Sequence, residues 1–206
     1  MTAPLTVLFD FRDPYSYLAL RPTWELIDET GVMSRWYPFL STPLKAPVPV
    51  RADADRGARH RWQRACYYEQ DLQRYAQARQ LPAGHFFDGG LYRPASGEVA
   101  AMGFNWVAGT GPAAARAYLN EVFEGYWDGS LSLDAMADIE TVLFGCGAEV
   151  EGFDDYCEAD GIEELFSQRE SLIEEGAFAT PAYLHDKQIY LGRQHLPMLR
   201  SLLEAP

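Results

Sequence analysis

The chain has 206 residues, of which 48% are hydrophobic and 14% are aromatic, a composition far too apolar for a disordered protein. Its 30 Asp and Glu against 17 Lys and Arg give a formal net charge of −13, and a field of that sign repels phosphate backbones and anionic lipid headgroups. The composition therefore argues against a nucleic-acid or membrane partner and favours a small-molecule partner.

The N-terminal segment predicts a strand followed by a helix. Thr6 to Phe11 (TVLFDF) is a short β-branched and aromatic run, typical of a buried strand. Asp13 suits a helix N-cap and Pro14 suits the first turn. A helix is therefore expected from Tyr15 to Thr30, closed by Gly31.

A second strand and a mostly helical block are expected next. Ser34 to Leu40 (SRWYPFL) predicts a strand at a sheet edge or a strand end, because Pro38 has no ladder donor. Residues 42–57 are rich in proline and charge and predict a loop. A helix is predicted from Arg56 to Gln80. The side chains expected on or near its apolar face are Trp62, Cys66, Leu72, Tyr75 and Ala76.

The rest of this block predicts a loop and further helices. Residues 81–96 hold several Gly and Pro and predict a loop. Pro112 begins a helix with a regular apolar face, and Ser132 or Asp134 is expected to cap another helix that ends near Gly145. Two more helices are predicted, over residues 153–160 and 162–175.

After Gly176 the pattern returns to strands. Ala182 to His185 and Gln188 to Leu191 are short strand-like runs that flank the tight turn Asp186-Lys187. A last helix is expected from about His195 to Leu203. This end of the chain therefore predicts a β-β-α unit.

The order of elements indicates a single α/β domain over residues 1–206, with an insertion. The two halves, residues 1–45 and 176–206, would form the core, and a helical block over about residues 55–160 would be inserted between them. This plan resembles a thioredoxin fold, in which a cis proline precedes the first strand of the second half. Here that bond is Thr180-Pro181, for which an ordinary trans proline at a strand start is the local alternative.

Several segments together resemble one family, the 2-hydroxychromene-2-carboxylate isomerases and kappa-class glutathione transferases. These are DsbA-like thioredoxin proteins with a helical insertion. The likeness extends from the first strand to the last helix. The segments that carry it are Phe9 to Leu18 (FDFRDPYSYL), Pro38 to Lys45 (PFLSTPLK), Asp71-Leu72 with Arg74, and Gly176 to Leu199 (GAFATPAYLHDKQIYLGRQHLPML).

The resemblance implies an enzyme that uses glutathione to isomerise or conjugate a small, aromatic compound. By the same resemblance, Lys45 would help to hold the anionic ligand, and Tyr15, Thr180 and Pro181 would border the glutathione site. The family also implies a homodimer. A disulfide oxidoreductase is not expected, because the position that would need a nucleophilic cysteine holds Asp13.

Asp13 departs from the family, which has a serine at this position to stabilise a thiolate. An ionised carboxylate cannot donate a hydrogen bond, and at about 4 Å it would repel a thiolate by roughly 4 kcal/mol at an effective dielectric of about 20. Asp13 could be protonated, or Arg12 could offset its charge. A plain N-cap role for Asp13 is equally open. The nearby Ser16 is expected to face a different side from Asp13.

The segment Gly192 to His195 also departs from the family's sequence, since Arg193 and Gln194 replace the acidic pattern there. No carboxylate remains in this segment to meet the γ-glutamyl ammonium. Arg193 suits an anionic ligand better, although a surface arginine next to the last helix is the plainer interpretation. The alternative function is a thioredoxin-fold protein that binds a small molecule and has lost thiol activation.

The remaining cysteine and histidine positions favour a cytoplasmic protein without a metal. Three cysteines (Cys66, Cys146 and Cys157) are widely separated and form no CxxC, so reduced, buried thiols are expected. The four histidines share no metal-ligand spacing. The N-terminus lacks the basic start of a signal peptide, and no run of about 20 uncharged apolar residues occurs.

Overall fold

Four short strands form one mixed sheet in the order β2-β1-β3-β4. β1 (Leu5–Phe9) pairs in parallel with β2 (Ser34–Pro38), and antiparallel with β3 (Ala182–His185). β4 (Gln188–Leu191) pairs antiparallel with β3. The computed structural model describes residues 3–44, 46, 48–51, 53–82 and 90–204.

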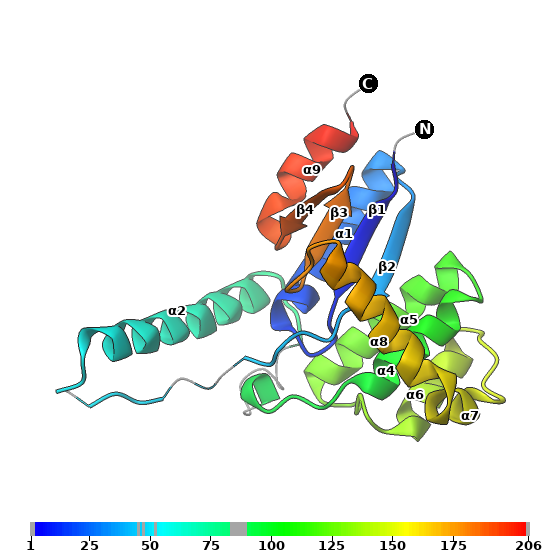
Figure 1. Cartoon of the computed structure of the whole chain (residues 1–206), viewed down its shortest axis with the longest axis horizontal. Helices are drawn as coiled ribbons and strands as arrows, with labels where there is room; N and C mark the ends of the chain where they lie inside the picture. The colour runs from blue at the N-terminus through cyan, green and yellow to red at the C-terminus, as the bar shows by residue number, and fades with distance from the viewer. Residues whose placement is uncertain (1–2, 45, 47, 52, 83–89, 205–206) are drawn as a thin grey trace.

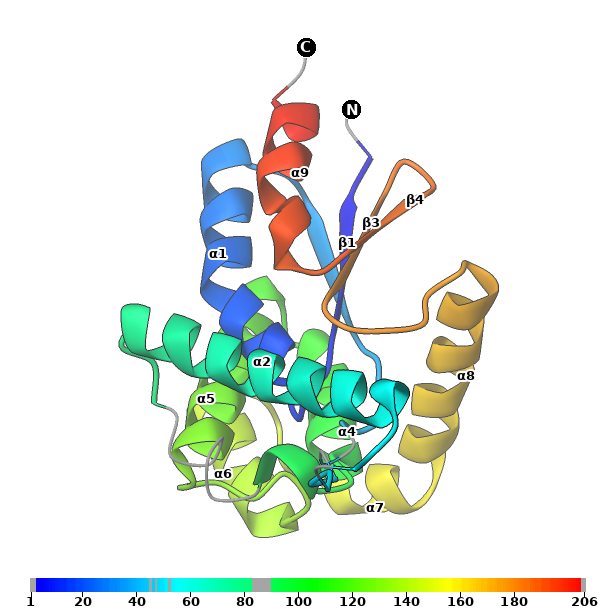
Figure 2. The same ribbon diagram turned by 90° about the vertical axis from the view of Figure 1, so that its left-hand side faces the viewer.

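Helices cover both faces of this sheet (Figures 1 and 2). On one face, α1 (Pro14–Thr30) and α9 (Leu196–Leu203) pack against Leu5 and Val7 of β1. On the other face, Leu172 of α8 (Asp160–Glu174) packs against Leu8. Alternate side chains of β1 thus point into different layers, as the pleat of a strand requires.

The remaining helices form a block that is inserted, in the sequence, between the two halves of the sheet. They are α2 (Arg56–Ala78), η1 (Gly90–Tyr92), α4 (Glu98–Ala108), α5 (Pro112–Asp128), α6 (Met136–Gly145) and α7 (Phe153–Glu158), and the short helix η2 (Arg193–His195) leads into α9. The α/β, thioredoxin-like order of β-α-β, helices and β-β-α is therefore confirmed.

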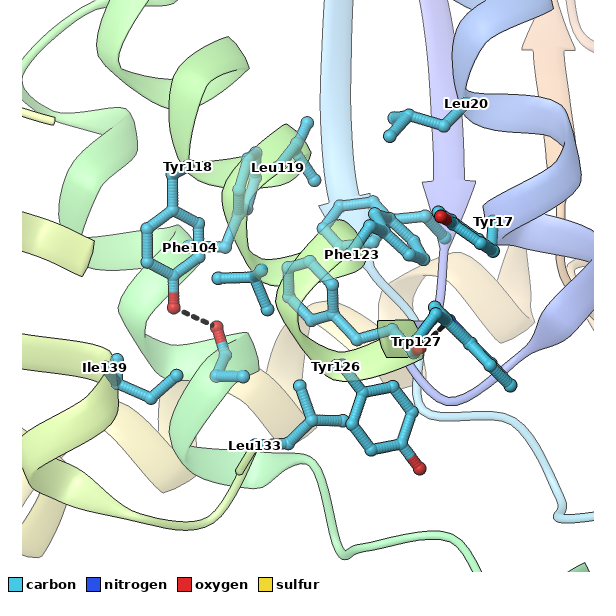
Figure 3. Close-up of a cluster of buried hydrophobic side chains, with 14 of the residues drawn as sticks. Tyr17, Leu20, Phe104, Tyr118, Leu119, Phe123, Tyr126, Trp127, Leu133 and Ile139 are labelled. Atoms are coloured by element: carbon cyan, nitrogen blue, oxygen red, sulfur yellow. Dashed lines mark hydrogen bonds between the residues drawn. The ribbon is translucent and has the colours of Figure 1, made fainter. Parts of the chain in front are cut away.

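The largest apolar cluster joins this block to the end of β1 (Figure 3). Phe123 is fully buried, and its ring centroid lies 4.8 Å from that of Phe11. Two polar atoms inside the cluster are satisfied by backbone carbonyls: the Tyr118 hydroxyl donates to Ala100 O at 2.8 Å, and Trp127 Nε1 donates to Phe11 O at 3.0 Å. Dense packing, with both of these polar atoms hydrogen-bonded, makes this cluster a rigid support.

Helix α4 was not predicted from the sequence, although it occupies the centre of the block. Its run EVAAMGFNWVA has no polar face, because the helix is covered on several sides, and an amphipathic pattern is therefore missing. Gly103 has no room for a side chain, since a Cβ there would collide with the Tyr118 hydroxyl. The buried residues of α4 are Ala100, Ala101, Met102, Gly103, Phe104 and Val107.

The predicted cap of α6 is wrong. The N-cap is Ala135, which makes no capping side-chain bond. Asp134 instead accepts from the backbone N–H groups of Ser96 and Gly97, at 2.8 Å and 2.7 Å, and so anchors the start of α4. A carboxylate can satisfy backbone donors far away in the sequence, and local spacing cannot show this.

The predicted apolar face of α2 is only partly confirmed. Leu72 and Ala76 are buried, whereas Trp62 and Cys66 are half-buried and Tyr75 is 39% exposed. Figure 1 shows why: the N-terminal half of α2 extends away from the body of the molecule. The sequence pattern gives the helix correctly but overstates how much of it is packed.

Candidate active site

Asp13 caps the first turn of α1, just beyond the carboxyl end of β1. Its carboxylate accepts from the backbone N–H groups of Tyr15 and Ser16, both at 3.1 Å. The N-cap role predicted from the sequence is therefore confirmed. At this place the carboxylate also meets the positive end of the α1 dipole.

Two side-chain hydroxyls also donate to the Asp13 carboxylate, so it does more than cap α1. Ser16 Oγ donates to Asp13 Oδ2 at 2.8 Å, so the prediction that Ser16 faces a different side is wrong. Side chains at the cap and three residues into the helix meet over the first turn. Thr180 Oγ1 donates to the same oxygen at 3.0 Å, and this bond joins α1 to the segment before β3.

The pKa of the Asp13 carboxyl group is far above that of an ordinary aspartate. Burial is the main cause and the nearby charge of Asp10 adds to it, and together they raise the pKa of Asp13 to about 7. Hydrogen bonds from Ser16, Tyr15 and Thr180 act in the opposite direction. At neutral pH this carboxyl group can therefore either hold a proton or accept one.

Asp10 fixes the loop that presents Asp13. The Asp10 side chain is buried and accepts from Arg12 Nε at 2.9 Å and from Arg12 Nη2 at 2.8 Å. It also accepts from the backbone N–H and the hydroxyl of Ser41, both at 2.8 Å, and so ties this loop to the segment after β2. Arg12 is thus committed to Asp10 and is not the counter-charge of Asp13 that the sequence suggested.

Two hollows flank the start of α1. The larger is a cleft of about 690 Å³ between α1, the C-terminal half of α2 and the segment from β4 to α9. The smaller, about 180 Å³, contains Asp13 and lies against residues 41–44 and Phe178. Tyr15 and Thr180 line both hollows, so a ligand that fills both would pass directly beside the Asp13 carboxyl group.

The structure brings together most of the residues that the sequence singled out. Tyr15, Thr180, Pro181, Arg193 and Gln194 all line the larger cleft. The Thr180–Pro181 peptide bond is cis and faces the start of α1, as predicted. Burial, followed by the charge of Asp13, raises the pKa of Tyr15, which keeps its hydroxyl a neutral donor. The predicted loop lysine, Lys45, lies outside the described residues.

Helix α2 supplies residues that sequence reasoning missed. The Arg193 guanidinium lies 3.7 Å from the centroid of the Tyr75 ring, a close cation–π contact across the cleft. Arg79 also lines the cleft, and its Nη1 donates to Leu18 O at 2.7 Å. No local signal marks such pairs, because their members lie far apart in the sequence.

Carboxylates reach the cleft from elsewhere in the fold. The segment after β4 has none, as the sequence showed, but Glu25 of α1 and Asp71 of α2 both line the cleft. Asp71 also accepts from Arg74 Nη1 at 2.8 Å. Gln194 turns back, and its Nε2 donates to Leu191 O at 2.6 Å. A ligand with both an ammonium and a carboxylate would thus find partners of both signs here.

The cysteines lie outside the two hollows. Cys66, Cys146 and Cys157 are free and half-buried, so the expectation of fully buried thiols is corrected. Burial, with nearby acidic groups, raises the pKa of Cys157 to about 11, which disfavours a reactive thiolate. Among the described residues, no group of three or more His, Cys, Asp or Glu could hold a metal ion. None of the described helices combines the length and apolarity needed to span a membrane.

Comparisons with known proteins agree with this architecture. The family model described as "DSBA-like thioredoxin domain" matches residues 5–204. The chain is 24% identical to 2-hydroxychromene-2-carboxylate isomerase of Pseudomonas putida over 196 residues, which cover 95% of this chain and 91% of the relative.

Solved structures show the same fold at lower identity. A structure of 2-hydroxychromene-2-carboxylate isomerase superposes with a TM-score of 0.69 at 22% identity, over 97% of this chain and 93% of that chain. The cytosolic disulfide reductase DsbM from Pseudomonas aeruginosa, solved with GSH, gives a TM-score of 0.62 at 19% identity, over 98% and 97% of the two chains. At these identities the structural likeness establishes the fold alone.

Proposed function

The chain belongs to the DSBA-like thioredoxin domain family, and on that premise we propose that it is an isomerase of the 2-hydroxychromene-2-carboxylate isomerase type. Relatives with that name at 24% and 25% identity, each matched over most of both chains, support an isomerase-like activity. The proposed substrate is small, conjugated and aromatic, and the proposed cofactor is glutathione. A cytoplasmic location remains a prediction from the sequence.

The observation that carries this proposal is the position of Asp13 in the smaller hollow, next to Tyr15 and Thr180, which line both hollows. The larger cleft has cationic and anionic side chains, whereas Leu44 and Phe178 give the smaller hollow an apolar rim. A polar cofactor and an apolar substrate would therefore lie on opposite sides of one titratable carboxyl group. Asp13, with its pKa near 7, is suited to proton transfer between them at neutral pH.

The charged residues of the cleft fit glutathione, which has two carboxylates and one ammonium. We assign Arg79 and Arg193 to its carboxylates and Asp71 to its ammonium, because all three line the cleft. Lys45 is proposed as a further cation from the loop after β2. When bound, glutathione supplies a thiol that adds reversibly to a conjugated substrate.

Asp13 and Tyr15 would carry out the proton transfer and the hydrogen bonding that this reaction needs. Ionised Asp13 accepts the thiol proton, and protonated Asp13 then donates a hydrogen bond, as the family serine does. Tyr15 lies next to it as a neutral donor for an oxygen of the substrate. Disulfide exchange is not proposed, because none of the described residues that line the hollows is a cysteine.

A second function, ligand binding without turnover, is favoured by the hydrogen bonds that Asp13 already makes. Its carboxylate accepts from Tyr15 N, from Ser16 N and Oγ, and from Thr180 Oγ1, so its capping role is complete without a substrate. In that case the chain would bind glutathione and leave the aromatic compound unchanged.

An assay with 2-hydroxychromene-2-carboxylate and glutathione tests the proposal. Wild-type turnover should require glutathione and should rise with pH through about 7 as Asp13 loses its proton. Asp13→Asn keeps a capping oxygen but cannot accept the proton, so its rate should fall about 10²–10⁴-fold and lose this pH step.

Asp13→Ser distinguishes the two functions, because it installs the family hydroxyl at the same place. A catalytic carboxylate predicts that this variant is slower than the wild type. If Asp13 only repels a thiolate, Asp13→Ser should bind glutathione more tightly than the wild type and gain turnover. Calorimetric glutathione binding by a wild type without turnover would support the binding protein and contradict the isomerase.

A further inference from the structure

A third hollow, of about 610 Å³, lies against the edge strand β2, and we call it the β2 hollow. Its walls come from β2, from the C-terminal halves of α1 and α4, and from the first half of α5. None of its described lining residues lines either hollow at the start of α1. Figure 1 shows β2 and α5 on one side of the molecule and α2, which borders the larger cleft, on the other. The β2 hollow is therefore separate from the candidate active site.

Large aromatic rings form the walls of the β2 hollow. The centroids of the Trp24 and Trp36 rings lie 4.3 Å apart, the two planes are tilted by 34°, and Phe104 lines the same hollow. Trp24 Nε1 donates to Asn120 Oδ1 at 3.1 Å, whereas Trp36 Nε1 is buried and no described residue accepts from it. A buried donor without an acceptor costs free energy, which an acceptor on a ligand would recover. These walls therefore suit a flat aromatic ligand with an acceptor group.

The charged side chains that border the β2 hollow are positive. Arg35 and Arg116 line it, and none of its described lining residues is Asp or Glu, although the whole chain has 30 acidic against 17 basic residues. Arg116 lies over the Trp24 ring at 4.5 Å, and its Nη1 donates to Asp28 Oδ1 at 2.7 Å. Arg35 is exposed and forms no salt bridge with a described residue. The Arg35 guanidinium is therefore available to an anion.

The start of α5 adds positive potential at the same place. Its N-cap, Gly111, has no side chain to cap the helix, and the first turn contains no acidic residue. Pro112 and Ala113 of that turn line the β2 hollow. The first backbone N–H groups of a helix have no partner within it and carry the positive end of its dipole. This helix end therefore favours the same sign of ligand as Arg35 does.

We propose that the β2 hollow binds a planar aromatic carboxylate. The ligand ring lies against Trp24 and Trp36, and its carboxylate accepts from Arg35 and from the first N–H groups of α5. The larger cleft differs, because Glu25 and Asp71 line it together with arginines. A hollow that combines aromatic walls with positive charge alone selects an aromatic anion over a zwitterion such as glutathione. The site does not depend on the proposed isomerase activity.

The probe is 2-naphthoate, and 2-naphthamide is its uncharged counterpart. Calorimetry should give a dissociation constant below about 1 mM for 2-naphthoate, in the presence or absence of excess glutathione, and at least about fivefold weaker binding of 2-naphthamide. NMR of the indole N–H groups locates the ligand. The signals of Trp24 and Trp36, assigned with the variants Trp24→Phe and Trp36→Phe, should shift, whereas the signal of Trp62 in α2 should not.

Arg35→Gln should weaken 2-naphthoate binding about three- to tenfold and leave the circular dichroism spectrum unchanged, because the side chain is exposed. The matched control is Arg21→Gln, an exposed arginine outside the hollow, and it should bind like the wild type.

Several results would overturn the proposal. Equal binding of 2-naphthoate and 2-naphthamide, or an equal loss in both arginine variants, would show that the hollow does not select an anion. An absence of binding up to about 1 mM, or shifts confined to indoles other than Trp24 and Trp36, would show that the ligand does not bind there. Signals of Trp24 and Trp36 that change on dilution of the ligand-free protein would show that a second copy fills the hollow instead.

Discussion

Helices α5 and α2 differ sharply in how many of their residues are buried. In α5 six of 17 residues are buried, including Phe123 and Trp127 at the centre of the aromatic cluster. In α2 only Leu72 and Ala76 of 23 residues are buried. Yet α2 supplies Asp71 and Tyr75 to the larger cleft, and its C-cap Arg79 lines it too. No α5 residue appears among the described residues that line either hollow at the start of α1.

In this pair of helices, stability comes mainly from α5 and contact with the ligand space at the start of α1 from α2. The α5 cluster fixes the end of β1 and thereby the loop that holds Asp10 and Asp13, so it acts on the site only through rigidity. Helix α2 borders the ligand space directly but gains little from burial. Elements with few buried contacts open at low free energy and are suited to adjust around a ligand.

Removing a buried ring from α5 should give the largest change in the free energy of unfolding. It tests whether α5 stabilises the fold. Phe123→Ala deletes a fully buried side chain and should lower the free energy of unfolding by about 3–5 kcal/mol. Tyr67→Ala in α2 removes a ring that is 55% exposed and should change it by less than about 0.5 kcal/mol. Urea unfolding of both variants, followed by circular dichroism, measures the difference.

The α2 half of this prediction can be contradicted by itself. A loss of more than about 2 kcal/mol in Tyr67→Ala would show that α2 is packed much more firmly than its two buried residues indicate.

The same contrast explains what the sequence could predict. The strands, α1 and α8 have local signals such as β-branched and aromatic runs, the Asp13 cap and the glycine after α1, and these predictions are confirmed. Helix α4 has none, since a helix buried on several sides has no polar face to mark its period. The Asp134 bond to Gly97 depends on tertiary approach, which no spacing rule contains.

The site was predictable only where it lies on the thioredoxin core. Asp13, Thr180 and Pro181 are fixed by β1, α1 and β3, whose order the sequence pattern indicates. The contact between Tyr75 and Arg193 depends on where α2 crosses the cleft, and that position follows from packing of the whole chain. The raised pKa of Asp13 likewise needs its burial and the charge of Asp10, neither of which can be inferred from residue order.

Measuring the free energy of unfolding as a function of pH tests whether the folded protein raises the pKa of Asp13. The folded-state pKa of Asp13, about 7, lies above the ordinary aspartate value of 3.8, so the native state holds this proton more tightly than the unfolded chain does. The contribution of Asp13 to stability should therefore be greatest below about pH 4 and should fall as the pH rises towards 7. One pKa unit is worth about 1.4 kcal/mol, so the loss can reach about 4 kcal/mol.

The variant Asp13→Asn isolates this effect, because asparagine keeps a capping oxygen and does not titrate. Subtracting its free energy of unfolding from that of the wild type at each pH cancels the other carboxylates. The difference should decline between about pH 4 and 7 and then level off. A difference that does not change with pH would show that Asp13 titrates like an exposed aspartate.

The smallest expected effect concerns the contact that holds the cleft wall of α2 in place. The Tyr75 ring lies under the Arg193 guanidinium, and such a contact is worth about 0.5–1 kcal/mol at a partly exposed site. Tyr75→Leu removes the ring and should weaken calorimetric glutathione binding about two- to fivefold, because Arg193 is no longer oriented towards the ligand. Tyr75→Phe keeps the ring and should bind like the wild type. An equal loss in both variants would assign the effect to the Tyr75 hydroxyl, and unchanged binding in both would contradict the role of Arg193 in holding a carboxylate. Since α2 has only two buried residues, the same Tyr75→Leu change should lower the free energy of unfolding by no more than about 1 kcal/mol, the value of this contact.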